Sequence, residues 1–118
     1  MTAIAFASPI LPGKLEAWRR FNQETLGVWA DGHDASNRRL GITQERAWLQ
    51  QTPEGNLAIV YLEVEDPERM FQGLATSNEP YDVWFRQQVL DIHGLDLSQP
   101  DDGPPPELAY TWSAVTTG

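Results

Sequence analysis

The chain of 118 residues contains no cysteine, which excludes disulfide bonds, thiolate metal sites and a cysteine nucleophile. That absence is compatible with the cytoplasmic location that we predict. Long apolar runs are also missing, and none approaches the roughly 20 residues that a membrane-spanning helix needs. The first segment, MTAIAFASPIL, lacks the basic stretch that opens a secretory signal peptide. We therefore expect a protein with no membrane partner.

Basic residues are scarce, because eight Lys and Arg stand against 17 Asp and Glu and the formal charge is −9. Such a chain is expected to be soluble and repelled by nucleic acid, so we predict no nucleic-acid partner. Most of the basic residues lie between Lys14 and Arg46. We prefer to interpret them as a solvated helix face, and the alternative is a patch for an anionic ligand.

Apolar residues make up 41% of the chain and include five tryptophans, which predicts one folded domain spanning residues 1–118. Residues 3–10 are apolar and stop before Pro12 and Gly13, as expected of a first strand. From residue 15 to residue 40 a stripe recurs at helical spacing, and Gly27 and Gly32 weaken it. We expect one long helix or two helices with a kink near Gly32, ending at Gly41. The stripe comprises Leu15, Trp18, Asn22, Leu26, Trp29, His33, Ser36 and Leu40.

The second half of the chain predicts a hairpin, two further helical segments and a last strand. Residues 45–51 and 56–65 alternate around the turn TPEG, and the second of these strands is apolar on both faces. Asp66 and Pro67 are typical of a helix start, and a further helix is predicted at about 79–93. We expect a mobile, acidic, proline-rich loop over 97–107 and a final strand over 108–115. The alternating residues of that strand are Leu108, Tyr110, Trp112 and Ala114.

This order of elements, β-α-β-β-α-β, predicts an α+β fold with a ferredoxin-like antiparallel sheet and helices on one face. The other face of the sheet carries Ile59 and Tyr61, and it is too apolar to face water. Burial of that face against a second copy of the chain predicts a homodimer that forms a dimeric α+β barrel.

Four segments resemble a family of small bacterial proteins that belong to the dimeric α+β-barrel superfamily and have no assigned function. They are PILPGKLEAWRRF, RRLGITQERAWLQQTPEG, VYLEVEDPE and WFRQQVLDIHGLDL. The resemblance covers nearly the whole chain and implies the fold but no reaction. The superfamily includes antibiotic-biosynthesis monooxygenases, EthD-like proteins and haem-degrading enzymes. The haem ligands of the last group are not matched, since the first strand has no Asn and Trp84 and His93 point to opposite sides of their helix. We therefore predict no cofactor.

The chain contains two histidines, and we expect different roles for them. His93 precedes Gly94 in the last predicted helical turn, where a histidine interacts favourably with the helix dipole, so we predict a structural role. It shares a side of the helix with Asp82 and Arg86, which we expect to be partly solvated and paired with each other. His33 lies on the apolar stripe, either as a satisfied core residue or beside a cavity between the helices and the sheet.

Four residues are the candidates for ligand binding: Asn22, Trp29, His33 and Tyr61. We predict no metal site, because the histidines lie far apart in the sequence and no motif for a metal is present. The acidic cluster Glu63, Glu65, Asp66 and Glu68 is interpreted as a helix start rather than a cation site. No nucleophile elbow, phosphate loop or dinucleotide fingerprint is found.

Three hypotheses on function follow from these observations. The first is a protein that binds a small aromatic or apolar molecule between the helices and the sheet. The second is a monooxygenase or isomerase that works without a cofactor. The third is a structural or interaction dimer with no ligand. The presence of an open cavity beside Asn22 and His33 would favour the first two hypotheses over the third.

Overall fold

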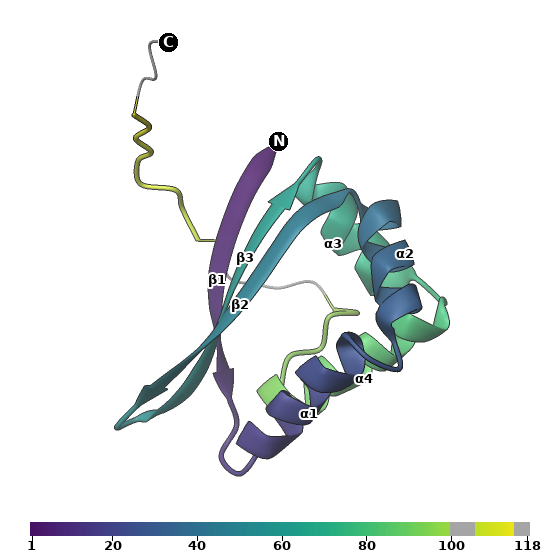
Figure 1. Cartoon of the computed structure of the whole chain (residues 1–118), viewed down its shortest axis with the longest axis vertical. Helices are drawn as coiled ribbons and strands as arrows, with labels where there is room; N and C mark the ends of the chain where they lie inside the picture. Colours follow the sequence, from purple (N-terminus) through teal and green to yellow (C-terminus); the bar gives the residue numbers. More distant parts are fainter. Residues whose placement is uncertain (100–105, 115–118) are drawn as a thin grey trace.

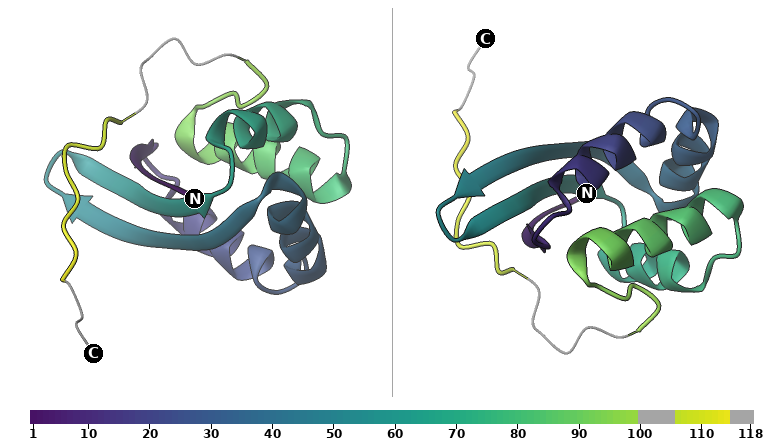
Figure 2. Two further views of the ribbon diagram at one scale, coloured as in Figure 1. Left: turned by 90° about the horizontal axis from the view of Figure 1, so that it is seen from above. Right: turned by 90° about the horizontal axis from the view of Figure 1, so that it is seen from below.

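The computed structural model describes residues 1–99 and 106–114. Within these residues, three strands form one antiparallel sheet in the order β1-β3-β2, and four helices lie on one side of it (Figure 1). The elements are β1 (Thr2–Ile10), α1 (Leu15–Thr25), α2 (Ala30–Leu40), β2 (Ile42–Thr52), β3 (Gly55–Val64), α3 (Pro67–Thr76) and α4 (Pro80–His93). Seen from above or below the view of Figure 1, the helices form two rows, α1 with α2 and α3 with α4 (Figure 2). The predicted α+β class is confirmed.

The hairpin of β2 and β3 is confirmed and is closed by its turn. The Thr52 hydroxyl accepts a hydrogen bond from the Glu54 N–H at 3.2 Å and donates one to the Gly55 carbonyl at 2.6 Å. These local bonds set the pairing of β2 with β3, and β1 pairs with the other edge of β3. Residues of β3 therefore alternate between the side that faces the helices and the side that does not.

The hydrophobic core is divided into two clusters at opposite ends of the sheet. Ile10, Ala58 and Ile92 belong to the first cluster, together with Trp18 and Phe21 of α1. The second cluster consists of Leu40, Leu62, Val64 and Met70. Each cluster joins the sheet to different helices. Phe6 and Val60, in the middle of the sheet, pack against the second cluster but are only partly buried.

The long helical stripe forms two helices, and the break lies at residues 26–29 rather than at the predicted kink near Gly32. Leu26 of the predicted stripe is 75% exposed, and Val28 beside it is 81% exposed. The break therefore places both side chains in solvent. Gly32 lies inside α2, where a Cβ atom would meet the Cβ of Tyr81 at 2.9 Å. This glycine therefore lets α2 and α4 approach each other and does not end a helix.

The predicted start of α3 and the predicted C-terminal end of α4 are confirmed. The Asp66 side chain accepts a hydrogen bond from the Arg69 N–H, and Pro67 begins α3. Gly94 follows His93 with a left-handed φ of 71°, a conformation that glycine adopts at little cost. His93 also hydrogen-bonds the Pro9 carbonyl through Nδ1 at 2.7 Å, which joins the end of α4 to the end of β1.

The prediction of a partly solvated Asp82-Arg86 pair is wrong. The Asp82 side chain is fully buried and is bound by Ser36 and Arg39 of α2, while Arg86 donates to the Leu74 carbonyl at 2.7 Å. Helical spacing put Asp82 and Arg86 on one side of α4. The spacing did not show that α2 would bury Asp82 or that Arg86 would bind a backbone carbonyl of α3.

The predicted final strand is not found in the described residues, because residues 106–114, here called the tail, carry no helix or strand. Its large side chains are exposed: Leu108 at 70%, Tyr110 at 84% and Trp112 at 79%. The tail lies on the side of the sheet away from the helices (Figures 1 and 2). Most of the predicted loop over 97–107, and Val115, lie outside the described residues.

Candidate ligand-binding site

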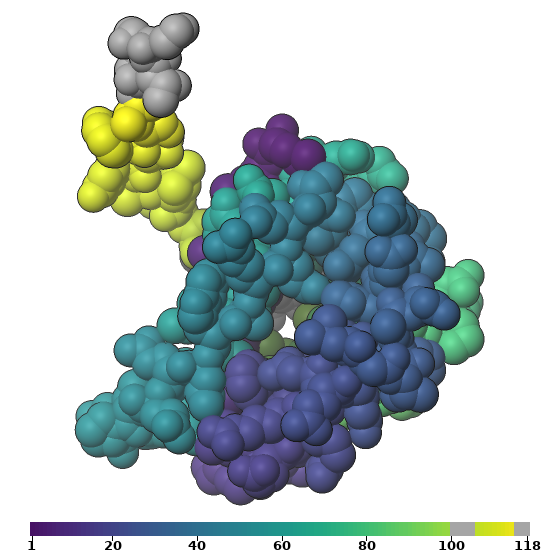
Figure 3. Space-filling view, in the orientation of Figure 1, coloured from purple at the N-terminus to yellow at the C-terminus, as the bar shows by residue number. Residues whose placement is uncertain are grey.

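The middle of the sheet is accessible on the side that faces the helices. Phe6, Val60 and Ala47 are neighbours across the three strands, and they point to the same side as the buried Leu62 and Val64. Phe6 and Val60 are only half-buried, and Ala47 is exposed. Figure 3 shows an opening between α1, α2 and β2. We call the space over Phe6, Val60 and Ala47 the hollow.

Aromatic rings from the helices lie between the two rows of helices and form the aromatic cluster. Trp29 stacks on Trp84 with ring centroids 5.1 Å apart, and Tyr81 lies 6.0 Å from Trp29 and 5.8 Å from Trp84. Phe21 and Phe85 extend the cluster towards the first core cluster. Broad, weakly polar ring faces of this kind are the usual lining of a site for an aromatic or apolar molecule.

A histidine and a glutamate connect α2 to β2 beside this cluster. His33 Nε2 lies 2.7 Å from Glu45 Oε1, and the His33 ring lies 5.6 Å from the Tyr81 ring. Glu45 precedes Ala47 by two residues and therefore points to the same side of β2 as Ala47. Asn37 Nδ2 donates to the same Glu45 oxygen at 3.4 Å. The polar pair thus lies at the edge of the hollow.

The environment shifts the protonation of both His33 and Tyr81. The hydrogen bond to Glu45 raises the pKa of His33 above its ordinary value; burial opposes the shift, and the charges of Glu45 and Asp34 favour it. Burial raises the pKa of the Tyr81 hydroxyl, and the charges of Glu45 and Asp82 raise it further. Tyr81 is therefore neutral over the physiological range and presents a hydroxyl, not a phenolate.

A groove of about 690 Å³ lies on the other side of the His33–Glu45 pair, between α2 and the start of β2. It is polar, and Asp34 and Arg38 in its wall form an ion pair at 2.9 Å. Its lining residues are His33, Asp34, Asn37, Arg38, Gly41, Ile42, Thr43, Gln44, Glu45 and Glu65. The pair therefore lines this polar groove, and it lies next to the hollow because Glu45 and Ala47 share one side of β2.

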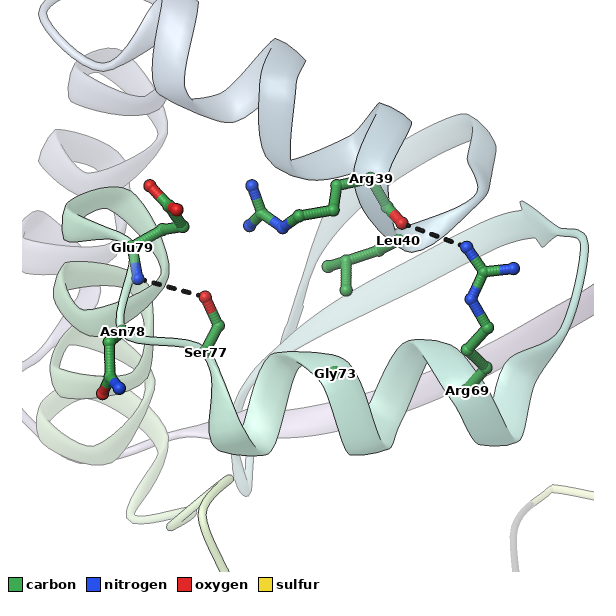
Figure 4. A pocket seen from close by; sticks show the side chains of 7 residues that line it. All are labelled: Arg39, Leu40, Arg69, Gly73, Ser77, Asn78 and Glu79. Carbon is green, nitrogen blue, oxygen red and sulfur yellow. Dashed lines mark hydrogen bonds between the residues drawn. The ribbon is translucent and has the colours of Figure 1, made fainter.

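A smaller pocket of about 430 Å³ lies between α2, α3 and the start of α4 (Figure 4). Arg39 and Arg69 line it, but Arg39 pairs with the buried Asp82 and Arg69 donates to the Arg39 carbonyl at 3.4 Å. Lys14 is likewise paired, with Asp91 at 2.9 Å. These pairs occupy Arg39 and Lys14 with carboxylates of the chain itself, which disfavours an anion patch at these residues.

The structure brings together two of the four predicted site residues. Trp29 and His33 both contact Tyr81. Asn22 lies on α1, and the break at residues 26–29 removes the shared stripe that linked it to His33. Tyr61 pairs with Ala5 and Arg46 and points to the side of the sheet away from the helices, because Leu62 next to it points inwards.

The sequence interpretation missed Glu45, Asn37 and Tyr81 as neighbours of His33, and Trp84 as the stacking partner of Trp29. One signal was available for Glu45. It alternates with Ala47 and Leu49 on one face of a strand, and a carboxylate on an otherwise apolar face needs a partner. No such signal existed for Tyr81, because its proximity to His33 depends on the packing of α2 against α4.

No group of three or more His, Asp or Glu side chains that could hold a metal occurs in residues 1–99 and 106–114. In the same part of the chain, no helix is both long enough and apolar enough to cross a membrane. Comparisons with family models, with curated proteins and with solved structures found no match. The resemblance to the dimeric α+β-barrel superfamily therefore stays a prediction.

Proposed function

We propose that the protein binds a small aromatic or apolar molecule in the hollow between the helices and the sheet. The observation that carries this proposal is the divided core, which leaves Phe6 and Val60 only partly buried and Ala47 exposed on the side that faces the helices. Exposed apolar surface inside a fold is unfavourable, by about 25 cal/mol per Å² left in water, unless a ligand covers it. Binding of an apolar molecule would remove that cost.

The neighbouring side chains support a site that selects for ring-shaped ligands. The aromatic cluster offers ring faces, and the His33–Glu45 pair offers a polar contact at the edge. A mostly apolar lining with a few polar groups is typical of small-molecule sites. The third hypothesis, a dimer with no ligand, requires instead that the hollow be closed by the protein's own side chains.

A fluorinated indole tests this proposal. We expect 5-fluoroindole to bind saturably, as followed by fluorine NMR line broadening. Ala47→Phe fills the hollow and should weaken binding by at least about tenfold, which corresponds to the loss of about 1.4 kcal/mol. Ala35→Phe is the matched control, because Ala35 is an exposed residue of α2 outside the hollow, and binding should not change. Absence of saturable binding, or equal effects of the two substitutions, would contradict the proposal.

We propose further that the chain assembles as a twofold dimer in the manner of an α+β barrel. The side of the sheet away from the helices, here called the outer face, carries Ala7, Ile59 and Trp48 in one row. Trp48 is 50% exposed, and the exposed apolar residues of the tail lie on the same side of the sheet. A second copy, with its own outer face and tail, is the self-complementary cover for such a surface.

The strand order supports the ferredoxin-like part of this proposal. β1-β3-β2 is the order of three of the four strands in that fold, and a fourth strand would pair with the free edge of β1. The alternating residues of the tail suit a strand at that edge. In the proposed dimer, the outer face of the second copy would cover the apolar side chains of the tail.

A further inference from the structure

His33 Nε2 lies 2.7 Å from Glu45 Oε1 and 3.2 Å from Asn37 Nδ2, and within the described residues no hydrogen bond is made by Nδ1. Because Nε2 and Glu45 Oε1 are 2.7 Å apart, one of the two atoms must carry a proton. Imidazole is more basic than a carboxylate, so the proton resides on Nε2. In the neutral ring the lone pair is therefore on Nδ1, which is the atom that a base would use.

The surroundings of His33 favour a base of fixed orientation. Its side chain is only 16% exposed and is held between Glu45 of β2 and the Tyr81 ring of α4. The other charged group near the ring is Asp34 on α2 itself, whose carboxylate is paired with Arg38. Asn37 holds the Glu45 carboxylate from the side. A histidine oriented by a carboxylate beside an apolar cavity is an arrangement that serves proton transfer.

We propose that His33 is a general base that removes a proton from carbon in an apolar carbonyl compound bound in the hollow, with Glu45 as its positioning residue. This inference rests on the proposed binding function. The C–H bond of the ligand breaks, a bond forms between that hydrogen and His33 Nδ1, and the electron pair moves into the carbonyl to give an enolate. When the ligand is a β,γ-unsaturated carbonyl compound, the negative charge extends over the C=C bond to the γ carbon. Return of the proton to that carbon gives the conjugated isomer and restores neutral His33, so no oxidant or reductant is needed.

Glu45 contributes by stabilising the imidazolium that forms during the reaction. Its carboxylate accepts the hydrogen bond from Nε2, and this bond becomes stronger when the ring gains a positive charge. The same bond raises the pKa of His33, which makes the neutral ring a stronger base. The alternative role of the pair is a structural link between α2 and β2, which would affect stability but not the rate of proton removal.

A nitrobenzisoxazole provides a probe of this base without knowledge of the natural ligand. A base removes the C–H proton of 5-nitrobenzisoxazole, that electron pair completes a nitrile, and the N–O bond breaks to release a coloured phenolate. An apolar cavity with a fixed base accelerates this ring opening. We expect the full-length protein to show saturable turnover that increases as the pH rises through the pKa of His33. Binding is measured separately by quenching of tryptophan fluorescence.

Two matched substitutions distinguish the two histidines. Glutamine at position 33 can still donate to Glu45, so His33→Gln should keep the fold but lower the rate by about 100-fold, the lower range for loss of a general base. His93→Gln should leave the rate unchanged, because His93 bonds the Pro9 carbonyl at the far end of α4. Glu45→Gln should keep part of the rate and move the midpoint of the pH profile to lower pH.

A rate that is the same in the wild type and in His33→Gln, with the probe bound by both, contradicts the base but leaves the binding function standing. An unmoved pH midpoint in Glu45→Gln contradicts the role given to Glu45. Absence of saturable probe binding, together with absence of 5-fluoroindole binding, removes both the proposed function and this inference. Unfolding curves of the variants show whether a lost rate reflects a lost fold.

Discussion

The carboxylate of Asp82 is 0% exposed, and two side chains of α2 supply its partners. The Ser36 hydroxyl donates to one oxygen at 2.5 Å, and the Arg39 guanidinium donates to the other. A buried charge without a partner costs several kcal/mol, so this trio connects α2 to α4 only while it is complete. Periodicity placed Asp82 on α4 but could not identify its partners, because they come from a distant segment.

The Arg39 side chain is 42% exposed, but its partner Asp82 is fully buried. Removal of Arg39 should therefore destabilise the protein more than removal of an ordinary surface arginine. We expect Arg39→Leu to lower the free energy of unfolding by about 3 kcal/mol, since Asp82 is left buried with Ser36 as its one partner. Asp82→Leu in the same chain should restore much of that loss, because the buried charge is removed as well. Urea unfolding of the single and double variants measures both effects.

Arg38→Leu is the control for this prediction. Its ion pair with Asp34 is exposed on both sides and is expected to contribute little to stability. Equal destabilisation by Arg38→Leu and Arg39→Leu would show that the buried pair contributes no more to stability than the exposed one.

At the scale of the elements, the close approach of α2 to α4 determines where the aromatic cluster and His33 meet. Gly32 permits that approach, because any side chain at this position would press on Tyr81. The sequence interpretation treated Gly32 as a weak point in a helix, which is its intrinsic tendency. Its function in the fold depends on its contact with Tyr81, which is far away in the sequence, and local propensity contains no information about that contact.

Gly32→Ala should destabilise the protein although alanine is the better helix former. The gain in helix propensity is about 1 kcal/mol, whereas an added methyl group 2.9 Å from the Tyr81 Cβ forces α4 to move, at a cost of about 1–3 kcal/mol. We expect a lower melting temperature and a changed near-ultraviolet circular dichroism signal from the displaced aromatic cluster.

Gly73→Ala is the matched substitution in α3. A Cβ there would also meet an atom at 2.9 Å, but that atom is Leu40 Cδ2, the far end of a flexible side chain. Because Leu40 can rotate away, we expect Gly73→Ala to be neutral or slightly stabilising. A Gly32→Ala protein as stable as Gly73→Ala would show that the contact of α2 with α4 is not tight.

At the scale of the whole molecule, both surfaces of the sheet have apolar residues that the single chain leaves accessible. The hollow is on the side of the helices, and the outer face is on the other side. β1 is an edge strand, and free strand edges favour pairing with another chain unless they are covered. These features support a ligand in the hollow and a second copy of the chain on the outer face.

We expect light scattering at micromolar concentration to give about twice the chain mass of 13.3 kDa. Trp48→Asp on the outer face should weaken association by roughly 30-fold or more, as expected for loss of an interface residue worth about 2 kcal/mol. Leu90→Asp is the control, because Leu90 is equally exposed, at 50%, but lies on α4. A monomer in the wild type, or dissociation by both substitutions, would contradict the dimer.

The sequence alone determined the features that depend on neighbouring residues. The turn at Thr52–Gly55, the start of α3 at Asp66 and Pro67, and the end of α4 at Gly94 all follow from bonds and backbone angles within a few positions. Tertiary structure alone decided the break at residues 26–29, the burial of Asp82 and the pairing of His33 with Glu45. It also left the tail unpaired and the core divided. These outcomes depend on contacts between distant segments, which local propensity and periodicity do not encode.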